Sequence, residues 1–507
     1  MPSFSYLRPH RMPSYSHLRF VDDDSENEAF NSKNYDYEYK ETLKMVKIGL
    51  EIDENPEKFQ RKTSNFVFWN KARIYVMVLS LLCLTLSQMN SLTFNFTVIC
   101  MDDLVEDHHE RNLTGLHWME SPTEKSLLFS GAAIGAMIGL IPSVPLISSL
   151  GIRNMLTASG FVSAAGSFFF PIAVSHYYYA VLMCRILQGL GISILFTVVG
   201  VIPGVWAPVN ESGTFMAILS MAFQLSSIIS MPVSGILCES QFGWRSIYYL
   251  FGVITFLAYI LFYIFYTDEP KMHRNVSDKE LNRIQNGKLE TIKEAVPYKA
   301  VFSDTTVQMA WLSVFGGNFG FFILVLYGPT YLRDILHFDV KGTGFASALP
   351  FVLSAIVKFT AGQLSDRMDF VSEKIRFTFC AVLSQAGVAA GFIVMSMTTN
   401  RLIAQIAYTF AITSSGLNIM GTIKCLQLRC RQHVHFAISV VSFCAYIIQF
   451  VAPIGVGIIV SDNTPEEWSR LFILVSVVVI IMNAPFPFLT SSEPGPYVKI
   501  VEKKNTV

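Results

Sequence analysis

Long apolar runs separated by short polar segments fill the chain between about residues 74 and 490. An α-helix needs roughly 20 apolar residues to cross the hydrocarbon core of a bilayer, and most of these runs meet that length. Two runs contain a basic residue, Arg185 in one and Lys358 in the other, but are apolar on both sides of it. The pattern therefore predicts about twelve membrane-spanning helices. They are expected at 74–101, 126–149, 154–174, 178–203, 213–237, 245–266, 306–332, 343–364, 376–397, 402–424, 435–460 and 469–490.

The longest polar segment between spans, residues 267–305, divides the predicted helices into six before it and six after it. We therefore expect an all-α integral membrane protein with two six-helix halves. The N-terminal segment is rich in Ser, Tyr, Asn and charge and has no apolar core of the length that a signal peptide needs. The expected parts are a disordered cytosolic tail (1–73), the N-terminal half (74–266), a cytosolic linker (267–305), the C-terminal half (306–490) and a cytosolic C-terminal tail (491–507).

The composition agrees with a membrane protein. Of the 507 residues, 52% are hydrophobic and only 15% are charged, whereas soluble domains carry about 25% charged residues. The formal net charge of zero favours neither a nucleic-acid binder nor a basic protein held at a membrane surface. The chain has no CxxC pair, zinc-ligand spacing, nucleotide-binding loop or nucleophile elbow, so we expect neither a metal nor another cofactor. Cys100 and Cys238 fall near outer helix ends, where they could pair or simply pack as small apolar groups.

Basic residues are distributed unevenly over the segments between spans. They cluster before the first span, in the linker and after the eighth and tenth spans, and they are sparse in the alternate loops. This is the positive-inside pattern, so we expect both termini and the linker to lie in the cytosol. The first outward loop contains Asn112-Leu113-Thr114, an N-glycosylation acceptor on the side where that modification occurs.

Charged residues within spans are the first candidates for function, because a charge at the middle of a membrane costs at least about 3 kcal/mol. Arg185 precedes Gln188 and Gly189 in the fourth span, where a guanidinium can bind a carboxylate or phosphate through two hydrogen bonds. It can equally brace neighbouring helices. Lys358 lies well inside the apolar run of the eighth span, where it can attract an anion or extend to the interface.

Uncharged polar residues on spans one, seven and ten can bind a solute in the centre of the membrane. Each can instead bond to a neighbouring helix, which is the commoner role of such residues. The small residues between 131 and 139 are expected to let helices approach closely rather than to bind a ligand. The candidate substrate-binding residues are Arg185, Lys358, Asn95, Asn318, Tyr327 and Asn418.

Several of these stretches resemble the anion:cation symporter family of the major facilitator superfamily, which includes sodium–phosphate, sialic-acid and vesicular glutamate transporters. The resemblance covers about residues 74–490, and the sequence looks like a divergent, nematode-like member. Arg185 with Gln188-Gly189-Leu190-Gly191, and Gly416-Leu417-Asn418, resemble the family's elements of spans four and ten. The most specific part comprises Asn318-Phe319-Gly320, Pro329-Thr330-Tyr331-Leu332, Ser347-Ala348-Leu349-Pro350-Phe351 and Gly362-Gln363-Leu364-Ser365-Asp366-Arg367.

The resemblance implies a twelve-span fold whose halves rock around a central solute site, and an anion as the solute. It also implies that Asp366 and Arg367 act in a cytosolic gate. Thr93 stands where the family usually has an Arg, and Ile192 stands where it usually has a Glu used in proton or sodium coupling. Coupling to a proton or to sodium is therefore open, and a uniporter driven by membrane potential is an alternative.

We therefore expect a secondary transporter, and not an enzyme, that moves a small organic or inorganic anion by alternating access. A transporter-like receptor or scaffold without transport is the main alternative, suggested by the missing Arg and Glu. A membrane-embedded enzyme would need catalytic partners for residues such as His108, His109 and His117, which fall in loops. Besides the anion and a coupling ion, the expected partner is the lipid bilayer, with no nucleic acid and a monomeric state. The resemblance is compatible with the plasma membrane and with endolysosomal or vesicular membranes.

Overall fold

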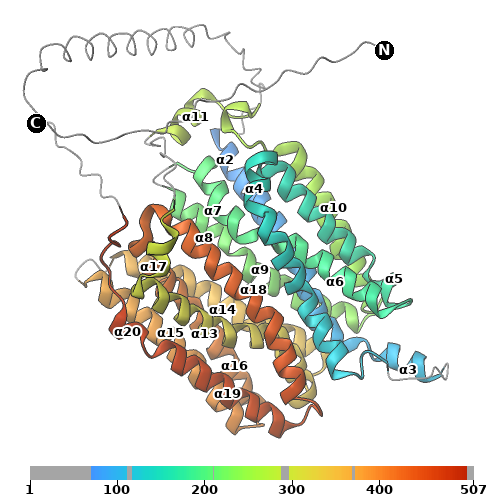
Figure 1. Ribbon diagram of the computed structural model, residues 1–507. Coiled ribbons are helices and arrows are strands. Elements are labelled where there is room, and N and C mark those ends of the chain that lie inside the picture. The colour runs from blue at the N-terminus through green and yellow to red at the C-terminus, as the bar shows by residue number, and fades with distance from the viewer. Residues whose placement is uncertain (1–69, 111–116, 209–210, 287–295, 368–370, 499–507) are drawn as a thin grey trace, which may run out of the picture. The chain divides into compact units, whose positions relative to one another are not determined.

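The computed structural model describes residues 70–110, 117–208, 211–286, 296–367 and 371–498, and every regular element within those ranges is a helix. Figure 1 shows the helices in chain order from blue to red. The first group, which we call the N-terminal group, comprises α2 (Ala72–Thr97), α3 (Asp102–Glu110), α4 (Pro122–Phe168), α5 (Phe170–Val174), α6 (Tyr178–Ile192), α7 (Leu195–Trp206), α8 (Ser212–Ser220), α9 (Ala222–Cys238) and α10 (Arg245–Phe265).

Two short helices, α11 (Asp278–Gln285) and α12 (Tyr298–Phe302), lie between this group and the next. The second group, which we call the C-terminal group, is interrupted by a π turn at Tyr331–Ile335 and by a 3-10 turn, η6, at Gly416–Ile419. Its helices are α13 (Thr305–Thr330), α14 (Val340–Arg367), α15 (Glu373–Met397), α16 (Arg401–Ser415), α17 (Thr422–Cys430), α18 (Val434–Ile459), α19 (Pro465–Asn483) and α20 (Phe486–Leu489).

Ten helical segments of the described residues are long and apolar enough to cross a membrane. One of them, Arg401–Ile459, has 59 residues and as a single helix would extend about 88 Å, far beyond the roughly 30 Å of a bilayer core. The 47-residue helix α4 is also longer than one span, and it breaks at Gly151, where φ is 78°. Arg185 and Lys358 lie within continuous helices, α6 and α14. The all-helical membrane class is confirmed, whereas the count of twelve spans and the cytosolic termini are still predictions.

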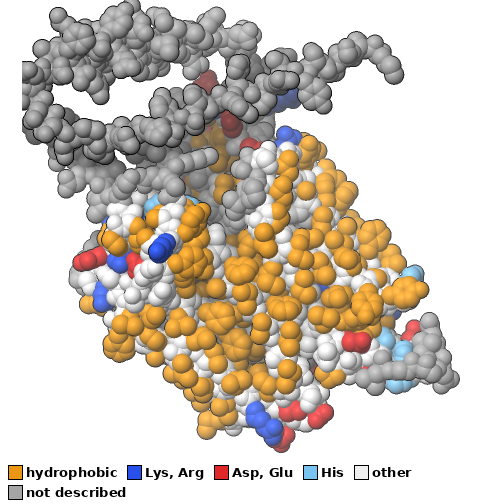
Figure 2. All heavy atoms as spheres, viewed as in Figure 1, with side chains coloured by type: hydrophobic (Ala, Val, Ile, Leu, Met, Phe, Trp, Pro, Cys, Tyr) orange, Lys and Arg blue, Asp and Glu red, His pale blue; other side chains and the backbone are white. Residues whose placement is uncertain are grey.

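Large apolar side chains cover the outer flanks of the helices. Ile141, Leu257, Ile264 and Phe359 are each more than half exposed. Figure 2 shows hydrophobic side chains across the middle of the visible face and charged side chains near its ends. A continuous apolar surface of this extent is stable against lipid tails, whereas soluble monomers rarely expose one. The chain is a multi-pass membrane protein, as predicted.

Helices α4 and α6 approach each other closely because each presents a glycine to the backbone of the other. A Cβ atom at Gly135 would lie 2.0 Å from the carbonyl oxygen of Ile186, and one at Gly189 would lie 1.9 Å from the carbonyl oxygen of Ala132. Any larger side chain would push the two helices apart. The small residues between 131 and 139 thus serve helix packing, as predicted.

The two groups of helices contact each other toward the end of the bundle where α3 lies, which we call the α3 end. There α9 packs against α14, and α4 packs against α18. The backbone N–H of Lys341 donates to Glu239 Oε1 over 2.9 Å, and the Ser130 hydroxyl donates to the carbonyl oxygen of Phe450 over 2.8 Å. These bonds join residues of the N-terminal group to residues of the C-terminal group.

A disulfide between Cys100 and Cys238 joins the turn after α2 to the last residue of α9. Next to it, the Asp103 carboxylate of α3 accepts hydrogen bonds from Trp244 Nε1 over 2.9 Å and from Arg245 Nη1 over 2.8 Å. Of the two alternatives that the sequence leaves for these cysteines, the structure shows the bonded one. The N-terminal group is therefore tied together covalently at its α3 end.

A network of ion pairs fixes α11 to the start of α2, at the opposite end of the bundle, which we call the α11 end. The buried Glu280 carboxylate accepts from the backbone N–H groups of Ala72 and Arg73, each over 3.1 Å. Arg73 Nε lies 3.1 Å from one Glu211 oxygen, and Arg283 Nη2 lies 2.6 Å from the other. Burial opposes ionisation of Glu211, but the hydrogen bonds and charges of the two arginines lower its pKa below the ordinary value. The linker helix is thus docked on the N-terminal group.

Candidate functional site

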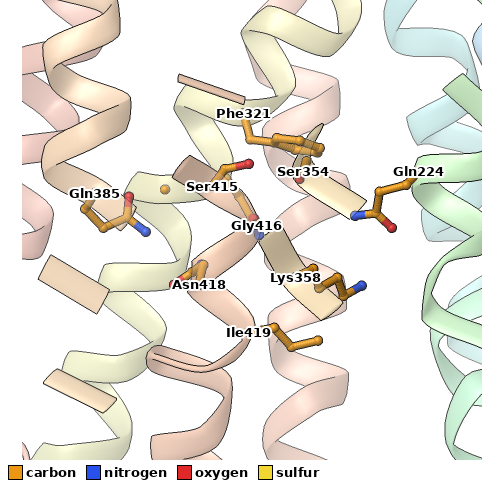
Figure 3. A pocket seen from close by; sticks show the side chains of 11 residues that line it. Gln224, Phe321, Ser354, Lys358, Gln385, Ser415, Gly416, Asn418 and Ile419 are labelled. Atoms are coloured by element: carbon orange, nitrogen blue, oxygen red, sulfur yellow. The ribbon is translucent and has the colours of Figure 1, made fainter. Parts of the chain in front are cut away.

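A cavity of about 520 Å³, measured with its open mouth, lies between α9 of the N-terminal group and helices α13 to α16 of the C-terminal group. Figure 3 shows the side chains that line it. Most of them are polar or small, which is unusual for the interior of a membrane bundle. The lining residues are Gln224, Gly317, Asn318, Phe321, Ser354, Lys358, Gln385, Ser415, Gly416, Asn418 and Ile419.

Interrupted helices shape two walls of the cavity. α16 gives way to the 3-10 turn η6 at Gly416, where an added Cβ would lie 2.8 Å from Ser354 Oγ, so α14 can approach only a glycine here. On the facing group, α8 ends at Ser220 and α9 begins at Ala222. Helix breaks at membrane depth are tolerated where they line a polar cavity, because the freed backbone groups can be satisfied there.

Of the lining residues that the structure describes, only Lys358 is basic. It lies on α14, eighteen positions after Val340 and so about 27 Å along the helix. Its Nζ atom donates to Ser220 Oγ over 2.9 Å and lies 3.5 Å from the Ser220 carbonyl oxygen. Among the side chains that the structure describes, no carboxylate lines the cavity or pairs with Lys358. The cavity therefore carries a cation whose charge its described neighbours do not cancel.

Four amide side chains line the same cavity, and two of them have an oxygen without a partner. The Oε1 atoms of Gln224 and Gln385 are buried and accept no hydrogen bond. Asn418 Oδ1 accepts from the Thr422 hydroxyl over 2.5 Å, and Asn318 lines the cavity from α13. A buried amide oxygen without a partner is free to accept a hydrogen bond from water or from a solute hydroxyl. The arrangement can donate to anionic oxygens and accept from hydroxyl groups.

Arg185 lies outside this cavity and is enclosed by three helices of the N-terminal group. Only 1% of its surface is exposed. Its Nε donates to the carbonyl oxygen of Leu128 over 3.0 Å, and its Nη1 donates to the carbonyl oxygen of Ser91 over 2.9 Å and to Gln188 Oε1 over 2.6 Å. The guanidinium also lies 4.8 Å from the centre of the Phe94 ring. In this conformation Arg185 braces helices, which is one of the two roles that the sequence leaves open.

Asn95 and Tyr327 also lie away from the cavity, nearer the α3 end. Both are buried, and Asn95 Oδ1 has no hydrogen-bond partner. The Tyr327 ring packs 4.6 Å from the ring of Phe129, across the contact between the two groups. The structure thus brings together three of the predicted binding residues, Lys358, Asn318 and Asn418, and separates the other three from them.

Three further predicted residues lie where the structure describes no side chain. Asp366 and Arg367 belong to the last turn of α14 by backbone, but their side chains are outside the described part of the chain. Asn112, the predicted glycosylation site, lies outside the described residues altogether. The gate and the glycosylation site are still predictions.

Sequence reasoning missed Gln224, Gln385, Ser354 and Ser415 as lining residues. Each lies within an apolar run, as Asn318 and Asn418 do, so a polar residue in mid-span was the available signal. That signal does not show which face of the helix a residue occupies. Gln224 and Ser415 also lie next to helix breaks, which help to set the direction of their side chains. Apolar periodicity does not reveal such breaks.

Three relatives of known name share about a quarter of their residues with this chain. Human sialin is 26% identical over 400 residues, which cover 77% of this chain and 79% of sialin. Sodium-dependent phosphate transport protein 1 of Oryctolagus cuniculus is 25% identical over 394 residues, or 76% of this chain and 84% of the relative. An uncharacterized transporter of Caenorhabditis elegans is 24% identical over 394 residues, or 74% of this chain and 73% of the relative. These relatives fit the anion:cation symporter family that the sequence resembles.

Solved transporter structures share the fold. The xylose transporter XylE of E. coli, in a partially occluded inward-open conformation, matches with a TM-score of 0.62 at 13% identity, covering 83% of this chain and all of that chain. A bacterial homologue of the human lysosomal transporter Spinster matches with a TM-score of 0.61 at 12% identity, covering 82% of this chain and 96% of that chain. The sequence pattern of the Major Facilitator Superfamily matches residues 77–453, which is well over half of the 507 residues. The chain belongs to the Major Facilitator Superfamily.

Proposed function

We propose that the protein is a secondary transporter that moves a small organic or inorganic anion by alternating access. The observation that carries this proposal is Lys358, which lines a polar cavity between the two groups of helices with no carboxylate beside it among the described side chains. The names of the relatives, sialin and sodium-dependent phosphate transport protein, agree with an anionic solute. Membership of a transporter superfamily also favours a carrier over an enzyme.

The electrostatics of the cavity favour an anion. A cation 4 Å from an anion gains about 4 kcal/mol at an effective dielectric constant of 20, and a neighbouring carboxylate would offset that gain. Within the described part of the chain, no such carboxylate lines this cavity. The amide groups of Asn318, Gln385 and Asn418 can add hydrogen bonds to the oxygens of a carboxylate or phosphate. A neutral solute would leave the Lys358 charge without a counter-ion in the membrane.

The contacts between the two groups support entry from the α11 end. Toward the α3 end, the Ser130–Phe450 bond and the packing of Phe129 on Tyr327 join the groups. The cavity lies farther along the bundle, around Lys358. By the positive-inside pattern the α11 end faces the cytosol. We propose that rocking of the groups opens the α3 end in a second state, where Arg185, Asn95 and Tyr327 are candidates for contact with the solute.

The test is anion uptake by purified protein in liposomes, with labelled phosphate, sialate, glutamate and urate. Lys358→Met keeps the length of the side chain but removes its charge, so the affinity for the transported anion should fall roughly 10- to 100-fold. Lys358→Arg keeps the charge and should retain part of the uptake. Lys424→Met is the matched control, because Lys424 also lies on a helix of the C-terminal group but does not line the cavity.

Uptake by Lys358→Met at the wild-type rate and affinity would refute this site. No uptake of any of the four anions by folded wild-type protein would refute the proposed transport and favour the receptor or scaffold alternative. Folding of each variant can be checked by its elution as a single species in size-exclusion chromatography.

A further inference from the structure

The cation that lines the cavity also bonds to the opposite group of helices. Lys358 belongs to α14 of the C-terminal group, and both of its hydrogen-bond acceptors belong to Ser220 of the N-terminal group. The Ser220 hydroxyl donates in turn to the carbonyl oxygen of Ala217 over 2.7 Å, which orients its lone pairs toward the lysine. Ser220 is the last residue of α8, at the break before α9. This bond therefore joins the two groups at the cavity itself.

Gln224 follows Ser220 by about one helical turn and is the only lining residue that the N-terminal group contributes among the described side chains. Its Oε1 atom is buried and has no partner. Figure 3 shows the Gln224 amide and the Lys358 amine extending into the same space from α9 and α14. The N-terminal group thus presents three acceptors to this region: the two Ser220 oxygens bond to Lys358, and Gln224 Oε1 has no partner.

A solute anion would compete with Ser220 for the lysine. Both Ser220 acceptors are neutral oxygens, whereas an anion also attracts the ammonium through its full charge, the Coulombic gain described above. Lys358 has a long flexible side chain, so it can turn from Ser220 to the cavity without movement of the backbone. Gln224 can then donate its amide N–H to the same anion and so keep the N-terminal group in contact with the solute.

We propose that Ser220 and the transported anion are alternative partners of Lys358, so that the empty carrier is latched through Lys358–Ser220 and the loaded carrier is joined through the anion and Gln224. This inference rests on the proposed function, because it requires an anion in the cavity. It assigns Gln224 as a solute contact and Ser220 as a positioning residue that acts through Lys358. The latch makes the contact between the two groups depend on occupancy of the cavity.

The latch can be tested first without any solute, by a double-mutant cycle on thermal stability in detergent. Ser220→Ala and Lys358→Met each remove one side of the same bond, so the double variant should melt no lower than the less stable single variant. Additive shifts in melting temperature would overturn the latch. Ser240→Ala is the matched control, since the Ser240 hydroxyl also donates to the carbonyl three residues before it but lies in the turn after α9, away from the cavity.

The second arm measures the KM for labelled sialate and for labelled phosphate in liposomes. Ser220→Ala should lower the KM about threefold because the lysine loses a competing acceptor, and Gln224→Ala should raise it by a similar factor. Gln224→Glu places a tethered carboxylate beside Lys358 and should abolish uptake. An unchanged KM in Ser220→Ala, together with lost uptake in Lys358→Met, would overturn the latch and leave the proposed function standing. Full uptake by Lys358→Met would overturn the proposed function and the latch with it.

Discussion

Arg185 illustrates how a buried charge can be satisfied without a counter-ion. Its guanidinium donates to two backbone carbonyls and to the Gln188 amide, and it lies against the face of the Phe94 ring. Carbonyl dipoles and a ring face supply negative potential at a lower desolvation cost than a carboxylate would. These contacts join α2, α4 and α6. A residue that resembles a binding site in the sequence is thus a brace in this conformation.

The two roles of Arg185 predict different results for Arg185→Lys. A lysine cannot reproduce the planar fork that reaches Leu128, Ser91 and Gln188 together, so a bracing role predicts a loss of about 2 kcal/mol of stability. Thermal unfolding in detergent measures this loss. A role in binding alone predicts an unchanged melting temperature with a raised KM for the anion, and that result would contradict the brace.

At the scale of elements, α11 is the helix whose attachment the structure explains most fully. Glu280 satisfies two backbone N–H groups at the start of α2 that a helix leaves unpaired, and its negative charge suits the positive end of that helix. Glu211, between α7 and α8, joins the same network through Arg73 and Arg283. A helix of the linker is therefore bound to the N-terminal group.

Glu280→Ala should loosen this attachment, because it leaves the buried Arg73 and two N–H groups without one of their acceptors. Removal of one partner of a buried ion pair costs about 3 kcal/mol, so the melting temperature should fall by several degrees. Protease protection of the linker, measured by limited proteolysis, should fall as well. The control is Lys279→Ala on the exposed side of the same helix, and equal effects of the two variants would show that Glu280 does not anchor α11.

At the scale of the whole molecule, the cavity bears on how transport is driven. No carboxylate lines it among the described side chains, and Ile192 stands where the family that the sequence resembles usually has a coupling Glu. A carrier of this kind can use the membrane potential alone, which contributes about 2.3 kcal/mol per charge per 100 mV.

This predicts that anion uptake into liposomes follows voltage and is insensitive to imposed pH and sodium gradients. At 100 mV, positive inside the liposome, a univalent anion should accumulate about 50-fold at equilibrium. Radiolabel uptake under potassium–valinomycin potentials measures the ratio. Accumulation driven by a sodium or proton gradient at zero voltage would instead show ion coupling through groups outside this cavity.

Hydropathy along the chain was enough to establish the class of the protein, because the cost of placing a residue in lipid is a local property of that residue. Runs of apolar residues therefore predicted the helices, and the small residues between 131 and 139 predicted a close helix approach, which the structure shows between α4 and α6. Lys358, Asn318 and Asn418 were also found in this way, since polar residues in mid-span are rare enough to notice.

Which of the polar residues meet depends on the folded arrangement of the helices. Successive residues of a helix point about 100° apart, so a prediction must know how each helix is rotated about its axis before it can say which side chains face the cavity. A break such as that at Met221 also changes the direction of every side chain after it. The enclosure of Arg185, the pairing of Cys100 with Cys238 and the placement of Gln224 beside Lys358 all depend on contacts between distant segments. Such contacts follow from the packing of whole helices against one another, and hydropathy along the chain does not reveal which helices pack together.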